Sequence, residues 1–203
     1  MSVLKRYIAK MLHNITQSGY YRLAVADALD RQHKAQFSHL GGNSILPAQL
    51  TLIGPQYTFI GDNFKADDRL RLEAWDNYAG QVFTPQLKIG NNVSLGTDVH
   101  IGCINQITIG SGVLMGSRIY ITDHSHGDTT TEALKLPPVQ RRLVSKGPVI
   151  IEDNVWIGDG VCIMPNVHVG TNAIIGANAV VTKDVPANTV VAGVPACIIK
   201  TLV

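Results

Sequence analysis

The feature that most constrains the fold is a strict six-residue repeat of aliphatic residues between Val149 and Val181. A second aliphatic set runs two positions ahead of the first, so each unit is expected to be a short strand whose ends point inward and whose middle residue points outward. The first set is Ile151, Ile157, Ile163, Val169, Ile175 and Val181. A period of six is typical of a parallel β-helix, in which three units, about 18 residues, close one triangular rung.

The repeat continues toward the N-terminus, but with interruptions. It begins irregularly at Ile45, becomes regular from Ile89, and contains an insertion of two residues between Ile101 and Ile109. It then stops over residues 123–148, a segment that opens with DHSHGD. A segment of this length without the repeat is usually functional in a compact domain. We therefore predict one long protruding loop, 123–148, on a β-helix domain that spans residues 43–203.

Residues 1–42 lack the repeat and are predicted to form an N-terminal helical segment. Aliphatic residues at helical spacing from Leu4 to Ile15 predict a short amphipathic helix, and a second helix is expected from about Tyr20 to Gln36. We expect the first helix to cover the open end of the coil. Because its other faces are basic, a weak peripheral contact with an anionic membrane surface is the alternative.

Composition limits the classes of partner and the compartment. The chain has 203 residues, of which 45% are hydrophobic and 16% charged, as in globular proteins with a buried core. A net charge of +2 does not favour a nucleic-acid partner. The three cysteines form no CxxC motif and cannot all pair, and neither an export signal nor a membrane span is visible, which indicates a cytoplasmic protein. The low charge and nineteen glycines suit a coil covered by further copies of itself.

One group of outward residues is expected to converge. With the two inserted residues a rung spans about 20 positions, so His100 and Tyr120 should share one outer face, one rung apart. Both should lie where the loop leaves the coil with His124. Histidine can accept a proton at neutral pH, as activation of a hydroxyl requires, so His124 is the candidate general base. His126 is its rival, and outward-facing His168 is expected to be structural or interfacial.

Taken together, these motifs resemble the hexapeptide-repeat O-acetyltransferases, which include maltose and galactoside acetyltransferases and the polysaccharide O-acetyltransferases of O-antigen or capsule. The similarity spans residues 87–200 and rests on the repeats, the TDH at the loop, the NVWIG after it and the closing IIGANAVVTKDVPANTVVAGVPA. It implies an all-β solenoid, specifically a left-handed parallel β-helix, that assembles as a homotrimer with active sites between neighbouring coils. It also implies acetyl-CoA as co-substrate, with no metal required.

The resemblance further implies the reaction and the acceptor side of the site. His124 would deprotonate a hydroxyl of a sugar or polysaccharide precursor for attack on the thioester, and His100, Tyr120 and His126 are the candidate acceptor-binding residues. The family's acceptor-binding asparagine has no clear counterpart near Gly96, so the identity of the acceptor is not carried over.

Contacts with the pantetheine of acetyl-CoA are also implied by the resemblance. Trp156 matches the family's tryptophan beside the active site and the pantetheine arm, although as an exposed indole it could equally pack at a subunit interface. Gly158, Asp159 and Ala177 match positions that line the pantetheine, where main-chain groups can pair with its amides.

The nucleotide end of acetyl-CoA is matched by residues near the C-terminus. Thr182 and Lys183 match positions near the nucleotide, and Lys200 matches a basic residue near its phosphates. Cys197 stands where many family members have Arg or Lys, which removes one expected phosphate contact.

Three alternatives remain open at this stage. The DHSHGD segment together with His100 could hold zinc, as in the gamma-class carbonic anhydrases of the same fold. A sugar N-acetyltransferase would use the same scaffold with an amine acceptor. A solenoid that only binds or scaffolds would keep the repeats, although retention of the loop histidine argues against it.

Overall fold

The computed structural model describes residues 34–128 and 130–202. The chain divides into two compact units, residues 1–36 and 37–203. The helix predicted from Leu4 to Ile15, and the one predicted from Tyr20 to Gln36 except its last residues, lie outside the described part. Within that part, no helix is long and apolar enough to cross a membrane.

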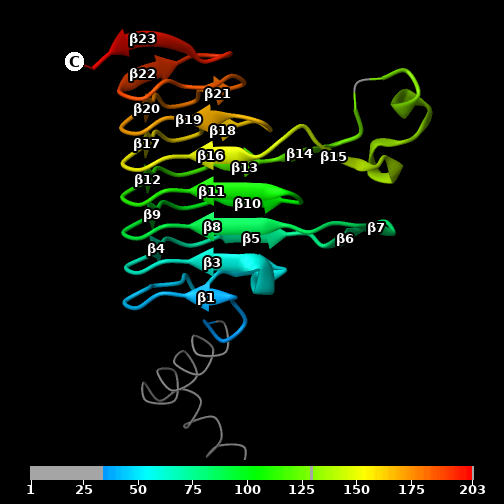
Figure 1. The fold of residues 1–203 in the computed structure, drawn as a ribbon, viewed down its shortest axis with the longest axis horizontal. Helices are drawn as coiled ribbons and strands as arrows, with labels where there is room; N and C mark the ends of the chain where they lie inside the picture. Colours follow the sequence, from blue (N-terminus) through cyan, green and yellow to red (C-terminus); the bar gives the residue numbers. More distant parts are fainter. Residues whose placement is uncertain (1–33, 129, 203) are drawn as a thin grey trace, which may run out of the picture. The chain divides into compact units, whose positions relative to one another are not determined.

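The second unit is a coil of three sheets in which every neighbouring pair of strands but one is parallel (Figure 1). Sheet 1 contains β1 (His39–Leu40), β3 (Thr58–Ile60), β8 (Gln86–Ile89), β11 (Gln106–Ile109), β16 (Val149–Ile151) and β19 (His168–Val169). Sheet 2 contains β2 (Leu50–Ile53), β5 (Leu70–Ala74), β10 (His100–Cys103), β13 (Tyr120–Thr122), β18 (Cys162–Ile163) and β21 (Val180–Val181). Sheet 3 contains β4 (Lys65–Ala66), β9 (Ser94–Leu95), β12 (Leu114–Met115), β17 (Trp156–Ile157), β20 (Ile174–Ile175), β22 (Thr189–Ala192) and β23 (Cys197–Thr201). The exception is the antiparallel pair β22–β23, which ends the coil.

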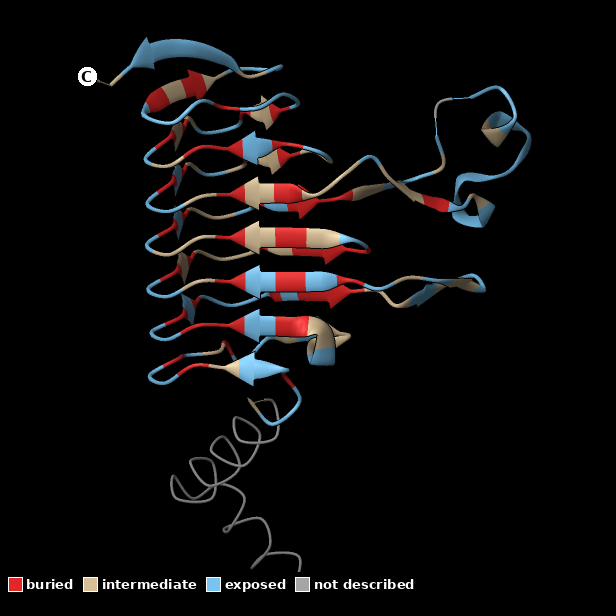
Figure 2. Ribbon diagram, viewed as in Figure 1, coloured by how far each residue is buried: buried red, intermediate tan, exposed pale blue. Residues whose placement is uncertain are grey.

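The inward and outward alternation predicted from the repeat is confirmed. Val149 and Ile151 are fully buried, and the residue between them is not. A similar alternation recurs from β3 to β21, and the buried positions form one continuous hydrophobic core along the coil (Figure 2). Each buried Val, Leu or Ile stabilises the fold by about 1.5–3 kcal/mol, so the repeat itself supplies the driving force for coiling.

The turns between strands explain why asparagine recurs at fixed positions. Asn154, Asn166, Asn172 and Asn178 all have φ near +60°, and Asn is among the few residues that tolerate this left-handed conformation. Side-chain amides also bridge successive rungs, as in the bond from Asn172 Nδ2 to Asn188 Oδ1 at 2.9 Å. The turns therefore contribute to rung stacking as well as to chain reversal.

The interruptions of the repeat all occur where the chain passes from sheet 2 to sheet 1. After β2 comes the 3₁₀ helix η1 (Pro55–Tyr57), after β5 the hairpin β6 (Asn77–Tyr78) and β7 (Gln81–Val82), and after β10 the two-residue insertion. After β13 comes the segment 123–148, which we call the arm. Figure 1 shows the hairpin and the arm projecting from the same side of the coil.

The arm has more structure than the loop predicted from the sequence. Its base is a two-stranded antiparallel ribbon of β14 (His124–His126) and β15 (Leu143–Ser145), and beyond it lie the 3₁₀ helices η2 (Ala133–Lys135) and η3 (Pro138–Gln140). The β6–β7 hairpin contacts the arm. Tyr78 Oη donates to the carbonyl of Val139 at 3.2 Å, and Leu143 N–H donates to Gln81 Oε1 at 2.9 Å. The hairpin and the arm are therefore joined by these two hydrogen bonds.

Candidate active site

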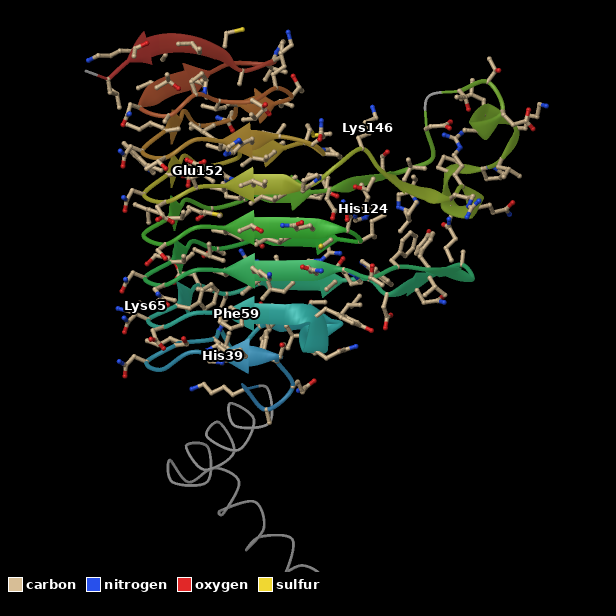
Figure 3. All side chains as sticks on the ribbon, viewed as in Figure 1. His39, Phe59, Lys65, His124, Lys146 and Glu152 are labelled. Carbon is tan, nitrogen blue, oxygen red and sulfur yellow. The ribbon has the colours of Figure 1, made fainter. Side chains whose placement is uncertain are left out.

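A cavity of about 330 Å³ lies where the arm leaves sheet 2. Four residues predicted for the acceptor side of the site, His100, Tyr120, His124 and His126, all line it. His100 and Tyr120 are register partners in the β10–β13 ladder, which confirms the predicted spacing of one rung. Figure 3 shows His124 at the base of the arm, with the rest of the arm extending away from the coil. The four residues that the sequence prediction grouped therefore do meet at one corner of the coil.

His124 is held in a defined orientation by a buried carboxylate. Its Nδ1 lies 2.9 Å from Oδ1 of Asp123, and the side chain of Asp123 is fully buried. Because a carboxylate only accepts hydrogen bonds, this contact places the proton of the neutral imidazole on Nδ1. The Nε2 atom then carries the lone pair, and it has no hydrogen-bond partner among the described residues. This arrangement leaves Nε2 able to accept a proton.

Asp123 in turn is fixed by the two-residue insertion of the rung below. Its carboxylate accepts hydrogen bonds from the backbone N–H groups of Ile104, at 3.0 Å, and Asn105, at 2.8 Å, and from the thiol of Cys103 at 3.4 Å. Burial disfavours the charged carboxylate, but the hydrogen bonds from His124 and from these two N–H groups outweigh it and lower the pKa of Asp123. The irregularity in the repeat is thus the binding site for this carboxylate.

The buried Cys103 has a supporting role in this network. Burial and the adjacent carboxylate raise the pKa of its thiol, so the group stays protonated and can donate to Asp123. Cys162 and Cys197 are also free thiols. Neither lines the cavity that contains His124.

A second buried carboxylate, Glu73, organises the opposite wall of the cavity. Its Oε1 accepts from Arg71 Nε at 3.0 Å and Nη2 at 2.7 Å, and its Oε2 lies 3.4 Å from Trp75 Nε1 and 3.2 Å from His100 Nε2. Burial opposes its ionisation, yet the hydrogen bonds from His100 and Arg71 lower the pKa of Glu73 to about 2. Glu73 is therefore ionised, and both of its carboxylate oxygens accept hydrogen bonds.

The rings of His100 and His124 lie on either side of Gly102. A Cβ atom at Gly102 would stand 3.4 Å from Cε1 of His124 and 3.7 Å from Nε2 of His100. A methyl group at Gly102 would therefore make ordinary van der Waals contacts with both imidazoles. Aromatic rings complete the walls: Tyr120 lies 5.2 Å from His100, and Tyr78 lies 5.4 Å from His126, between ring centroids. Such faces suit the apolar C–H groups of a sugar ring.

Three functional residues of this site were not assigned from the sequence. Asp123 was visible in the TDH motif, but its role depends on the insertion folding beneath it. Glu73 follows Arg71 by two positions in the strand LRLEA, so continued alternation would have placed both on the outer face. Gly102 is the register partner of Glu73 in the β5–β10 ladder. Its place in the site could be recognised only once this register was known.

The residues predicted to contact the pantetheine gather elsewhere. Trp156, Gly158, Asp159 and Ala177 line one hollow of about 320 Å³ over sheet 3. The side chain of Trp156 is 53% exposed. This hollow shares no lining residue with the cavity of His124.

The residues predicted for the nucleotide end are separate again. Thr182 lines another hollow with Lys146 and Asn166, near the base of the arm. Lys183 is exposed in the turn after β21. Lys200 is exposed on the last strand, opposite Val190. None of the three lines the hollow of Trp156.

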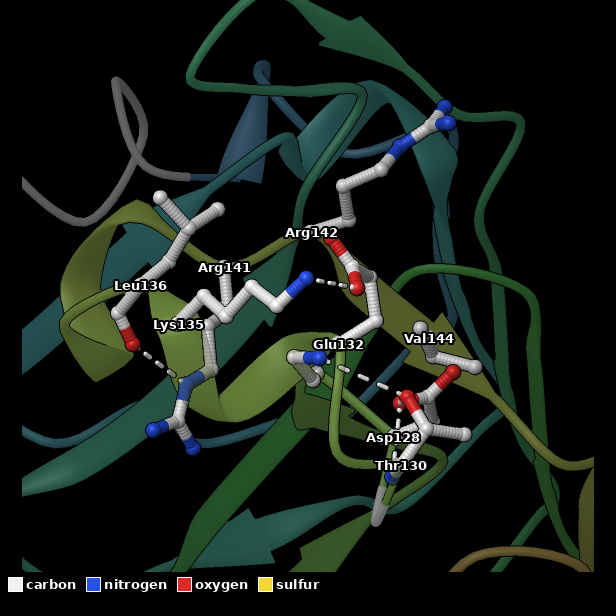
Figure 4. A pocket seen from close by; sticks show the side chains of 10 residues that line it. Asp128, Thr130, Glu132, Lys135, Leu136, Arg141, Arg142 and Val144 are labelled. Atoms are coloured by element: carbon white, nitrogen blue, oxygen red, sulfur yellow. Dashed lines mark hydrogen bonds and ion pairs between the residues drawn. The ribbon is translucent and has the colours of Figure 1, made fainter.

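The arm contains a further hollow of about 380 Å³ (Figure 4). Its lining includes an ion pair between Lys135 and Glu132, at 2.6 Å, and a bond from Arg141 Nε to the carbonyl of Leu136 at 2.9 Å. None of the predicted site residues lies in it.

Within residues 34–128 and 130–202, no group of three or more His, Cys, Asp or Glu side chains lies close enough together to hold a metal ion. Of the three histidines in the zinc alternative, His100 faces Glu73 and His124 faces Asp123. His126 lies edge-on to the ring of Tyr78.

A three-sided parallel coil with a histidine–carboxylate pair at an interrupted corner defines a hexapeptide-repeat transferase. The sequence profile described as bacterial transferase hexapeptide (six repeats) matches residues 148–183. WbbJ of Escherichia coli strain K12, named as a lipopolysaccharide biosynthesis O-acetyl transferase, is 39% identical over 144 residues, which cover 69% of each chain.

Two solved structures extend the comparison. A galactoside acetyltransferase in complex with coenzyme A is 26% identical, with a TM-score of 0.53 over 96% of this chain and 78% of that one. AntD, an N-acyltransferase from Bacillus cereus solved with dTDP and coenzyme A, has the same fold, with a TM-score of 0.70, 23% identity and coverage of 86% and 88%. The chain belongs to the hexapeptide-repeat O-acetyltransferase family, and it is an acyltransferase.

Proposed function

We propose that this protein transfers the acetyl group of acetyl-CoA to a hydroxyl of a sugar or surface-polysaccharide precursor, with His124 as general base. The observation that carries the proposal is the Asp123–His124 pair in the lining of an aromatic-walled cavity, because it leaves Nε2 without a partner among residues 34–128 and 130–202. The relatives support the same chemistry: WbbJ is named for O-acetyl transfer in lipopolysaccharide biosynthesis, and the galactoside acetyltransferase was solved with coenzyme A.

The reaction requires one proton transfer in each direction. His124 Nε2 accepts the hydroxyl proton while the acceptor oxygen forms a bond to the carbonyl carbon of the thioester. The carbon–sulfur bond then breaks, and the proton returns from His124 to the leaving sulfur. Ionised Asp123 stabilises the imidazolium that exists between these two steps. His100, Tyr120 and His126 hold the acceptor beside Nε2.

The donor binds between two copies of a left-handed coil in a homotrimer. This arrangement would bring the hollow of Trp156, Gly158, Asp159 and Ala177 on one copy to the cavity of His124 on the next, since the two share no lining residue within one chain. Glycine is needed at position 158 for the rungs to stack, because a Cβ there would stand 2.7 Å from the backbone nitrogen of Ala177.

Thr182, Lys183 and Lys200 extend the donor groove toward the nucleotide. We further propose that the β-helix domain carries the activity and that the enzyme is cytoplasmic, in keeping with its free cysteines. The coil already includes β1 (His39–Leu40), ahead of the start at residue 43 that the sequence predicted.

An acceptor screen tests the proposal. Purified protein is incubated with acetyl-CoA and a panel of sugars and sugar nucleotides, and free thiol release is followed together with the mass of each product. Acceptor-dependent thiol release with an O-acetylated product is the expected result. Transfer only to amino groups would replace this function with N-acetylation, and no transfer to any sugar would refute it.

A further inference from the structure

Arg71 stands at the junction of two hollows. It lines the cavity of His124 and also an adjoining hollow of about 430 Å³ that includes Thr51, Arg69 and Asp98. Its side chain is 50% exposed although its partner Glu73 is buried. The guanidinium therefore faces both spaces from the wall that carries His100 on the next rung.

The guanidinium is fixed in place. Arg71 gives Nε and Nη2 to the single oxygen Oε1 of Glu73, at 3.0 and 2.7 Å. Glu73 is itself held by Trp75 and His100, so the anchor does not depend on Arg71 alone. The remaining N–H groups of Arg71 have no partner among the described residues. A preorganised arginine with free N–H groups is the usual means by which proteins bind a phosphate or a carboxylate.

The carboxylates near Arg71 are already engaged. Both oxygens of Glu73 are occupied, and Asp98 in the adjoining hollow is paired with Arg69 through both of its oxygens. Asp123 lies fully buried behind His124. The described lining therefore offers an anion a free donor, but it offers an ammonium group no free carboxylate.

We propose that the acceptor is an anionic sugar, whose phosphate or carboxylate binds the free N–H groups of Arg71 while its hydroxyl lies against His124 Nε2. Arg71 is then the residue that selects charged over neutral acceptors, and Glu73 is the residue that positions it. This inference rests on the proposed acetyl transfer, since it names the class of acceptor for the same cavity.

Matched sugars separate charge from shape. Glucose, glucose 1-phosphate and glucuronic acid, and the same three compounds of galactose, are compared as acceptors by kcat/KM for thiol release. Wild-type protein should prefer the phosphate or the carboxylate over the neutral sugar by about tenfold or more, as expected for hydrogen bonds to a charged group. Whether the sugar phosphate or the uronic acid is the better acceptor in each set shows which of the two anions the site recognises.

Variants assign the preference to Arg71. Arg71→Met should abolish it, and Arg71→Lys should restore only part of it because a lysine lacks the paired donors. Arg118→Met removes an exposed arginine that lines neither hollow and should keep the wild-type preference. Because the preference is a ratio measured within one variant, partial misfolding does not mimic the result.

Direct binding separates this inference from the proposed function. Titration of glucose 1-phosphate, glucuronic acid and glucose in the presence of coenzyme A reports anion binding without transfer. Arg71-dependent binding of an anion, without acetylation of any sugar, would keep the anion site and refute the proposed reaction. Equal use or equal binding of neutral and charged sugars, a preference that survives Arg71→Met, or no anion binding at all would overturn the inference.

Discussion

At the scale of single residues, two buried carboxylates determine what the cavity can do. Asp123 sets the tautomer of His124, and Glu73 holds Arg71 and His100 on the opposite wall. Both are ionised despite burial because each accepts several hydrogen bonds. The sequence identified the histidines, since an outward histidine stands out in an aliphatic repeat. It did not identify the carboxylates, because their roles arise from contacts between different rungs.

Asp123→Asn should lower kcat by about a hundredfold or more, because an amide can present an N–H to Nδ1 and favour the wrong tautomer. The free energy of unfolding should fall by about 1–3 kcal/mol as a backbone N–H of the insertion loses its acceptor. Steady-state kinetics and urea denaturation measure the two effects. Asp128→Asn, an exposed change in the same arm, is the control, and a wild-type kcat in Asp123→Asn would contradict the assigned role.

Glu73 should make stability depend on acidity. Its pKa is about 2 in the folded protein, below the ordinary value of 4.5, so its contribution is complete above pH 4.5 and is lost as the pH falls toward 2. Wild-type protein should therefore lose more free energy of unfolding across this interval than Glu73→Gln does. Urea denaturation at several pH values checks this, and parallel curves for the two proteins would show that Glu73 contributes nothing to acid sensitivity.

At the scale of structural elements, the active corner consists of departures from the repeat. The insertion after β10, the β6–β7 hairpin and the arm all follow strands of sheet 2, so the regular rungs act as a scaffold that stacks them. The positions of the insertion and of the arm were predictable from the spacing of aliphatic residues, whereas the β6–β7 hairpin was not predicted. The β14–β15 pairing was not, because HSH and LVS have no alternating pattern that predicts a ribbon.

The arm should be dispensable beyond its base. His124 is anchored by Asp123 and Thr122, both at the coil, rather than by η2 or η3. Replacing residues 128–140 with a short Gly-Ser turn should leave kcat within a few-fold of wild type and raise KM for the acceptor, because Tyr78 loses its bond to Val139. Circular dichroism checks that the β-helix of this variant is still folded. A loss of kcat as large as that of His124→Ala would mean that the tip positions the base.

At the scale of the whole molecule, the coil separates the acceptor and donor sides of the proposed site. The core and the register of His100 with Tyr120 followed from the period of six, because each rung repeats the geometry of the last. The assignment of donor residues came from the resemblance alone. The separation of Trp156 from His124 in one chain was not readable from spacing, since it depends on which sheet each residue occupies.

Mixed assemblies should regain activity if active sites lie between copies. Trp156→Ala should raise KM for acetyl-CoA, and His124→Ala should lack the base. Co-expression of the two variants produces some interfaces that combine an intact Trp156 with an intact His124. At low acetyl-CoA, the mixed sample should exceed the summed activity of the separate variants. Activity no greater than that sum would place both residues in the site of a single chain.

The most direct measurement of the central claim is the rate of thiol release by His124→Ala at saturating acetyl-CoA and acceptor. The rate should fall by about a hundredfold or more, as expected for loss of a general base, while acetyl-CoA binding measured by titration persists. His168→Ala, which removes an exposed histidine paired with Glu152 on sheet 1, should retain the wild-type rate. A His124→Ala rate equal to that of wild type would contradict the assignment of His124 as the base.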